Sequence, residues 1–243
     1  GALRLLARGL APTIATPLAI ASRDAATPQA RGALLFAMLP YMLMLTIFIG
    51  GIWLAIDSTA GERERQSLEP LLINPVPRDR ILMGKLLATA SFSLASLALG
   101  LLAFLAAGRF MPTEELGMNL ALGPHFFLVA LPLLLPLVLL LCIAQILIAA
   151  FARSVREAQT YLGLAQLVPL IPSIVLSVLP IKAQLWMYAV PLLGQQLALM
   201  RLLRAEPLPA VAVALSAVVT LLAVVAVFAL ARHVYNSEKL AIA

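Results

Sequence analysis

Five stretches of the sequence are apolar over about 20 residues, which is the length a helix needs to cross the hydrocarbon core of a bilayer. This feature constrains the fold more than any other, because hydrocarbon offers backbone N–H and C=O groups no water to bind. We therefore expect an all-α integral membrane protein with five transmembrane helices. The expected spans are about 34–56, 86–107, 126–151, 160–181 and 208–231.

Composition agrees with this class and excludes others. Of 243 residues, 63% are hydrophobic and 12% are charged, whereas a soluble domain is about half apolar and a quarter charged. The spans leave too few residues for a separate soluble catalytic domain, so we expect any ATPase on another polypeptide. The net charge of +6 does not indicate nucleic-acid binding, because the basic residues stand between apolar segments. We predict no catalytic residues and no metal site, since the single cysteine and two histidines lack ligand spacing.

The segments outside the spans divide the chain further. Residues 1–33 read as an extracytoplasmic lead-in, and residues 34–243 as the transmembrane domain. The segment 186–203 is apolar, but Pro191 and Gly194 break it midway, which favours a re-entrant or interfacial helical hairpin before the last span. Prolines should kink or interrupt the fourth span; these are Pro169, Pro172 and Pro180.

The distribution of Lys and Arg predicts an orientation. Loops 57–85, 152–159 and 232–243 lie on one side and carry nine basic residues, against four in 108–125 and 182–207. Cytoplasmic loops are enriched in Lys and Arg. We therefore expect a multi-pass protein of the inner (cytoplasmic) membrane with the lead-in outside and the C-terminal tail in the cytoplasm.

Polar groups inside the expected spans are hydroxyls and amides, without Asp, Glu, Lys or Arg. They include Thr46, Ser91, Ser93, Ser96, Gln145, Gln166, Ser173 and Ser177. Ion-coupled transporters usually place ionisable groups at membrane depth, so a self-powered transporter is disfavoured. An ion or small-solute channel not driven by ATP stays an alternative. A membrane-embedded lipid-modifying enzyme is a weaker alternative, because it would need four residues to converge on one site: Arg109, Glu114, Glu115 and His125.

The segment 57–85 carries most of the functional information. It is expected to hold a short helix with a charged end, formed by Glu62, Arg63, Glu64 and Arg65, and an apolar end. A Pro-defined turn follows, because each proline removes a backbone donor, and a second helix then starts near Arg78. The apolar end with its neighbouring acid is Leu68, Glu69, Leu71, Leu72 and Ile73, and the turn is Asn74, Pro75 and Pro77. A solvated positive-inside loop is the plain alternative, but the interleaved acids and bases favour a protein contact.

These motifs resemble the cytoplasmic signature of ABC type-2 export permeases, in particular those of the sodium-efflux type. The resemblance rests on Ala60-Gly-Glu-Arg-Glu-Arg65, Ser67-Leu-Glu-Pro-Leu-Leu72, Pro75-Val-Pro-Arg78 and Gly84-Lys-Leu86. It also includes Ala26-Thr-Pro-Gln29, Leu39-Pro-Tyr41 and the broken apolar segment before the final span. It implies that 34–56 is the second of six spans and that the chain is the C-terminal part of a longer permease, without the first span and most of an extracytoplasmic domain.

The resemblance also implies partners and a mechanism. Residues 60–73 would be a coupling helix seated in a groove of a separate ABC ATPase, which binds the ATP and magnesium, and a second permease half would complete a homodimer. The charged residues 62–65 would pair with the ATPase or with neighbouring helices, and the leucines would fill the apolar seat. The chain itself would bind no cofactor and would not be an enzyme. The cargo implied is sodium, although apolar walls suit an amphipathic drug, peptide or lipid better.

Overall fold

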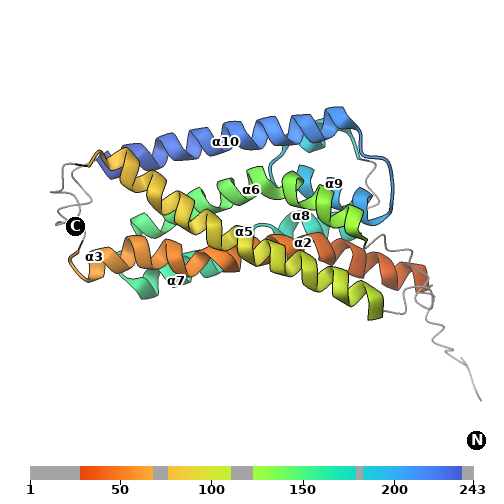
Figure 1. Ribbon diagram of the computed structural model, residues 1–243, viewed down its shortest axis with the longest axis horizontal. Coiled ribbons are helices and arrows are strands. Elements are labelled where there is room, and N and C mark those ends of the chain that lie inside the picture. The colour runs from red at the N-terminus through yellow and green to blue at the C-terminus, as the bar shows by residue number, and fades with distance from the viewer. Residues whose placement is uncertain (1–27, 68–75, 111–122, 179–182, 237–243) are drawn as a thin grey trace, which may run out of the picture.

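The computed structural model describes residues 28–67, 76–110, 123–178 and 183–236. Within these residues every regular element is a helix, and the long helices run roughly side by side (Figure 1). They are α2 (Pro28–Ile56), α5 (Arg78–Phe110), α6 (Pro124–Phe151), α7 (Val155–Ala165), α8 (Leu170–Val178), α9 (Leu193–Leu203) and α10 (Ala210–Asn236). A π-helical turn, η2 (Asp57–Gly61), and a short α3 (Glu62–Glu64) continue α2, and a 3₁₀ turn, η3 (Leu185–Ala189), precedes α9.

The expected all-α membrane fold is confirmed. Five helices of the described chain are long and apolar enough to cross a membrane: Met38–Glu64, Arg78–Gly108, Pro124–Phe151, Val155–Leu176 and Ala210–Tyr235. The first of them runs from α2 through η2 into α3, and the fourth joins α7 to α8. Each corresponds to one of the five stretches that the sequence marks as apolar.

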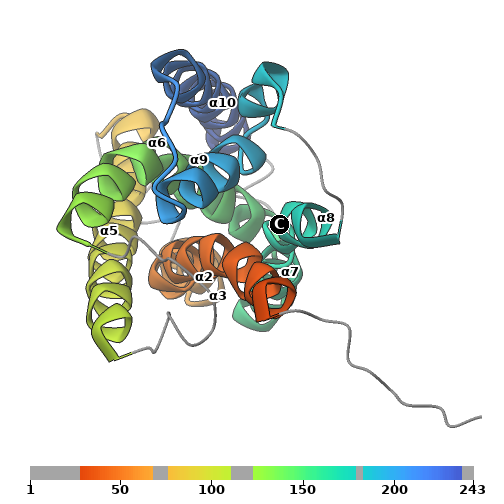
Figure 2. The same cartoon turned by 90° about the vertical axis from the view of Figure 1, so that its right-hand side faces the viewer.

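The helices form a bundle with α2 and α6 near its middle (Figure 2). In the most apolar stretches of the spans that contain α2 and α6, 50% and 56% of the residues are buried, against 22% for α5 and 17% for α10. The fully buried side chains Leu43, Ile47, Leu134 and Ile143 belong to these two central helices. The outer faces of α5 and α10 are therefore left to lipid or to another protein.

The structure differs from the expected bounds at the start of the first helix and agrees with them at the start of α5. Helix α2 begins at Pro28, inside the expected lead-in, and proline is well suited to the first helical position. Helix α5 begins at Arg78, as predicted for the second helix, so its apolar stretch from about residue 86 is preceded by about two helical turns. A helix can continue through charged residues at the bilayer surface, because long basic side chains reach water there. A hydropathy scale marks only the edge of the apolar stretch, so it places the helix end too far inward.

The fourth span is interrupted, as its prolines predict. Helix α7 ends at Ala165 and α8 begins at Leu170. The residues between them form turns in which an N–H binds the carbonyl three residues back, for example Leu170 N–H to Leu167 O at 3.0 Å. Pro169 lies inside this interruption, where it has no N–H to contribute. The third proline of the expected set, Pro180, lies outside the described residues.

The segment before the last span contains η3 and α9. Helix α9 has 11 residues, so it is about 16 Å long and too short to cross a hydrocarbon core of about 30 Å. Leu192, just before it, has a φ of 72°, and its N–H donates to the Gln195 side chain at 2.9 Å. The amide of Gln196 donates to the Pro169 carbonyl at 2.7 Å, which fixes α9 against the interruption of the fourth span.

A seam of small and hydroxyl-bearing residues joins α2 to α5. A Cβ on Gly50 would lie 2.4 Å from Ser96 Cβ, and one on Gly51 would lie 2.5 Å from Ser93 Oγ. The Ser96 hydroxyl donates to the Thr46 carbonyl at 2.9 Å, and Gly100 packs on the Thr46 side chain. Residues 46 and 50 thus face residues 100 and 96, so the two helices run antiparallel in close contact.

Candidate functional site

The charged stretch after α2 lies at one end of the bundle, at the left in Figure 1. We call its contacts the junction cluster; the members are Asp57, Ser58, Glu62, Arg63, Glu64, Arg65 and Lys85. The expected helix over 60–73 is corrected in one respect, because residues 60–64 continue α2 through η2 and α3 instead of starting a separate helix. This continuous helix ends where Gln66 takes a φ of 55°.

The centre of the junction cluster is an ion pair between Glu62 and Lys85. The Lys85 ammonium contacts Glu62 Oε2 and also donates to the Ser58 carbonyl. Its side chain is 6% exposed, against 23% for Glu62. The Tyr235 ring of α10 adds a cation–π contact, with its centroid 5.8 Å from the Lys85 nitrogen. One lysine on α5 therefore binds η2, α3 and α10 together.

Arg63 joins α3 to the end of α6. Its guanidinium donates to the Ala152 carbonyl at 2.9 Å and to the Ala150 carbonyl at 3.1 Å. The last carbonyls of a helix have no partners within the helix, and a positive charge at that end also opposes the helix dipole. Arg63 therefore caps α6, although it lies 87 residues before Ala150 and 89 residues before Ala152 in the sequence.

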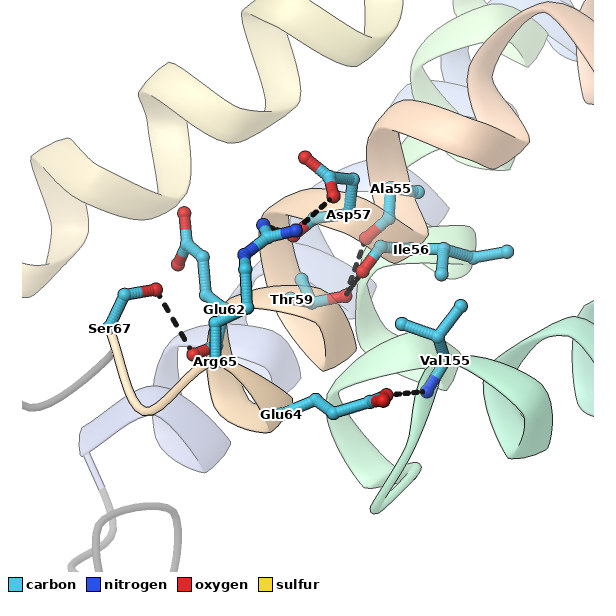
Figure 3. A network of polar contacts seen from close by, with 9 residues as sticks. All are labelled: Ala55, Ile56, Asp57, Thr59, Glu62, Glu64, Arg65, Ser67 and Val155. Carbon is cyan, nitrogen blue, oxygen red and sulfur yellow. Dashed lines mark hydrogen bonds and ion pairs between the residues drawn. The ribbon is translucent and has the colours of Figure 1, made fainter.

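Glu64 binds the beginning of α7, as Figure 3 shows. Its Oε2 accepts a hydrogen bond from the Val155 N–H at 2.9 Å. Val155 is the first residue of α7, where N–H groups lack helical partners and a negative charge is favourable. The start of α7 is capped again by Ser154, whose hydroxyl accepts from the Glu157 N–H at 3.3 Å.

Arg65 forms an exposed ion pair at the surface of the junction cluster. Its guanidinium lies 2.8 Å from Asp57 Oδ1, and the two side chains are 57% and 63% exposed. The hydrogen bond to the carboxylate raises the pKa of the guanidinium further above its ordinary value, so Arg65 stays charged under physiological conditions. Exposed pairs of this kind contribute little to stability. Arg65 is accordingly open to an external partner, in contrast to the half-buried Glu62 and Arg63.

Two further contacts tie the start of α5 to the end of α10. Arg78 donates to the Tyr235 carbonyl at 3.0 Å, and Arg232 pairs with Asp79 at 2.8 Å. Pro77 stands just before α5, and its carbonyl accepts from the Arg80 N–H at 2.9 Å. Together with the contacts of Lys85, Arg63 and Glu64, these contacts join five helices at the end of the bundle that carries α3. The five are α3, α5, α6, α7 and α10.

The structure thus places all four charged candidates of residues 62–65 in contacts within the chain. The other candidates, Leu68, Glu69, Leu71, Leu72, Asn74 and Pro75, lie outside the described residues, as do Glu114 and Glu115. Sequence reasoning missed the partner residues, namely Asp57, Ser58, Lys85 and the α10 residues Arg232 and Tyr235. Of these partner residues, only Lys85 was indicated by the sequence, because it belongs to the Gly84-Lys-Leu86 motif.

Some polar residues at membrane depth bind neighbouring helices, whereas Thr46 and Ser91 donate to carbonyls of their own helix. The Gln145 amide of α6 donates to the Phe48 carbonyl of α2 at 2.8 Å, and the Cys142 thiol lies 3.3 Å from the Ser93 hydroxyl. Gln195 of α9 donates to the Thr220 hydroxyl of α10 at 2.6 Å. Among the described residues no group of three or more His, Cys, Asp or Glu side chains is placed to hold a metal ion.

Comparison with known proteins gives a consistent result. The model of the ABC-2 family transporter proteins matches residues 10–240. The chain is similar to the ABC transporter permease protein NatB of Bacillus subtilis (strain 168), with 30% identity over 241 residues. That alignment covers 97% of this chain and 62% of the relative, so the chain spans less than two thirds of the length of the relative. No solved structure matches the chain significantly.

Proposed function

Because the chain belongs to the ABC-2 family of transporter proteins, we propose that it acts as the transmembrane permease subunit of an ATP-driven exporter. A separate ABC ATPase would bind the ATP and magnesium, and a second permease half, a copy of this chain, would complete the pathway. The family match carries this proposal, and the similarity to a protein named as an ABC transporter permease supports it. The contacts of residues 62–64 with α5, α6 and α7 support it, because a held end of the bundle is suited to receiving force.

We propose that the end of the bundle with the junction cluster faces the cytoplasm. This agrees with the excess of Lys and Arg in the loops 57–85, 152–159 and 232–243. Cysteine labelling tests it, with Ser67→Cys and Thr113→Cys expected to react from opposite sides of the membrane. Cys142 is the only native cysteine and is buried, so it should give little background. Labelling of both positions from the same side would contradict the five-span topology, and labelling of Ser67→Cys from outside would contradict the orientation.

We propose different roles for the two parts of 60–73. The charges of residues 62–64 are engaged with α5, α6 and α7, so we propose that they transmit force inside the permease. The leucines Leu68, Leu71 and Leu72 would then supply affinity for the ATPase, since burying a leucine contributes roughly 1.5 to 3 kcal/mol. If the ATPase displaced residues 68–73, the displacement would reach α5 through the Glu62–Lys85 pair. It would reach α6 through Arg63 and α7 through Glu64.

The test uses the full permease with its ATPase in liposomes. Leu68→Asp with Leu71→Asp should abolish co-purification of the ATPase and the permease-dependent part of ATP hydrolysis, because two carboxylates cannot enter an apolar groove. Gln159→Asp is the matched control, since it adds a charge at an exposed position of α7 at the same end. Unchanged association and hydrolysis in the leucine variant would remove the coupling assignment.

The cargo is tested in the same liposomes. Export of ²²Na⁺ and stimulation of ATP hydrolysis by amphipathic drugs, peptides or lipids are compared, because sodium needs several oxygen ligands while amphiphiles need apolar walls. Transport of either cargo must stop when ATP is omitted. Conductance that persists without ATP or the ATPase would instead support the channel alternative.

A further inference from the structure

The helix that begins as α2 contains an unusual turn where it leaves the membrane. From Asp57 to Gly61 it is π-helical, and α3 follows directly. π-helical turns accommodate one extra residue within an α-helix and occur frequently at functional sites. Thr59, Ala60 and Gly61 are buried, so the wide turn is packed inside the protein and does not result from fraying at a free helix end.

The bonds around the turn show what keeps it wide. The Glu62 N–H donates to the Thr59 carbonyl, three residues back, whereas in an α-helix it would donate to the Ser58 carbonyl, four residues back. Lys85 donates to that Ser58 carbonyl and pairs with Glu62. The Thr59 hydroxyl donates to the Ala55 carbonyl one turn earlier, as Figure 3 shows. Side chains therefore bind carbonyls that backbone N–H groups would bind in a regular helix.

We propose that Lys85 is a positioning residue that holds the turn Asp57–Gly61 in its wide form, and that the turn tightens to an α-helix when Lys85 releases Ser58 and Glu62. This inference rests on the proposed function for the source of force, which is the ATPase acting beyond residue 67. Tightening by one residue turns everything after it by about 100° and moves it about 1.5 Å along the axis.

A rotation of that size makes the turn a switch with two states. Glu62, Arg63 and Glu64 are consecutive, and they bind α5, α6 and α7 respectively. A rotation of about 100° takes all three side chains off their partners together, because neighbouring residues on a helix are separated by that same angle. No partial rotation preserves one contact without straining the other two. The three contacts therefore favour the wide form jointly and are lost jointly.

The rotation can be measured as a distance between spin labels. Labels are placed on Gln66→Cys and Gln159→Cys, both exposed and both outside the junction cluster. A rotation of about 100° at a radius of about 5 Å shifts a surface position by about 8 Å. In the full permease without ATPase, Lys85→Met should shift the distance distribution by several ångströms, while Lys85→Arg, which keeps the charge and the donors, should keep the native distance. An unchanged distance in Lys85→Met would overturn the proposal.

A one-residue deletion tests whether the movement is used. Deleting Thr59 removes the extra residue, so a regular α-helix can join α2 to α3 with the same faces exposed. This variant should still bind the ATPase, should show no distance change when ATP is added, and should lose at least tenfold in coupled transport. Full transport by the deletion variant would overturn the proposal. Should the deletion variant not fold, the distances in Lys85→Met and Lys85→Arg still decide the proposal.

The outcomes separate this inference from the proposed function. Failure of the unmodified permease to bind an ATPase or to stimulate ATP hydrolysis would defeat the proposed function, whereas the Lys85→Met distance is measured without ATPase. Coupled transport by the unmodified permease with no distance change on ATP addition would keep the proposed function and defeat the switch.

Discussion

Replacing Glu62 by Gln removes the carboxylate that faces the buried Lys85 ammonium. Removing one partner of a buried ion pair costs about 3 to 5 kcal/mol, because the other charge is left without compensation. Lys85 keeps the Ser58 carbonyl and the Tyr235 ring, so we expect the lower end, about 3 kcal/mol. The opposite change, Lys85→Met, leaves a carboxylate that is 23% exposed and reaches water. The regular helical hydrogen bonds of the tightened turn offset the contacts that Arg63 and Glu64 lose, so about 1 to 2 kcal/mol is expected.

The double variant Glu62→Gln with Lys85→Met makes the prediction specific. Once Lys85 is replaced, the Glu62 carboxylate no longer neutralises a buried charge, so its removal should cost nothing further. The double variant should therefore be about as stable as Lys85→Met alone. The coupling energy between the two positions is then about 3 kcal/mol.

Thermal unfolding of the purified permease in detergent measures these differences. For a chain of this size 1 kcal/mol corresponds to about 2 to 4 °C, so Glu62→Gln should lower the melting temperature by about 6 to 12 °C and Lys85→Met by about 2 to 8 °C. Equal losses in the two single variants, or additive losses in the double variant, would refute the reasoning from the unequal exposure of the two side chains.

Two further predictions concern packing and capping. Gly51→Ala should destabilise the bundle by about 1 to 3 kcal/mol, because its Cβ would lie 2.5 Å from Ser93 Oγ, while Gly84→Ala, with nothing within 4 Å of its Cβ, should be neutral or stabilising in the same unfolding assay. Arg63→Ala should cost about 2 to 3 kcal/mol through its hydrogen bonds to the end of α6, and proteolysis should reach that end faster. Arg65→Ala should leave both unfolding and proteolysis nearly unchanged; a larger effect at Arg65 than at Arg63 would contradict the contacts.

Much of the fold follows from hydropathy, because an apolar stretch of sufficient length has few alternatives to a membrane helix. The interruption of the fourth span was predictable from Pro169, whose missing N–H acts locally. The ends of α2 were predicted less well, since residues 28–33 and 57–64 continue the helix past the apolar stretch. The start of α5 at Arg78 was predicted, because the prolines before it define a turn. A hydropathy scale marks where the apolar stretch ends, but it does not indicate where the helix ends.

The junction cluster shows which part of the site needed three-dimensional information. The interleaved acids and bases of residues 62–65 predicted a protein contact, and the sequence left open whether the ATPase or neighbouring helices supplied the partners. The choice depends on the approach of Arg63 to Ala150 and Ala152, far away in the sequence, and no local pattern encodes that distance. The π-helical turn was also invisible, because one extra residue barely changes the polarity pattern over a single turn.

The seam between α2 and α5 constrains how the sequence can diverge. Gly50 faces Ser96 and Gly100 faces Thr46, so each close approach pairs a glycine on one helix with a hydroxyl-bearing residue on the other. A methyl group gained on one side has room only when atoms are removed from the other. Gly50→Ser should therefore be tolerated together with Ser96→Gly and not alone, and we expect the residues of this seam to change in pairs among relatives of the chain.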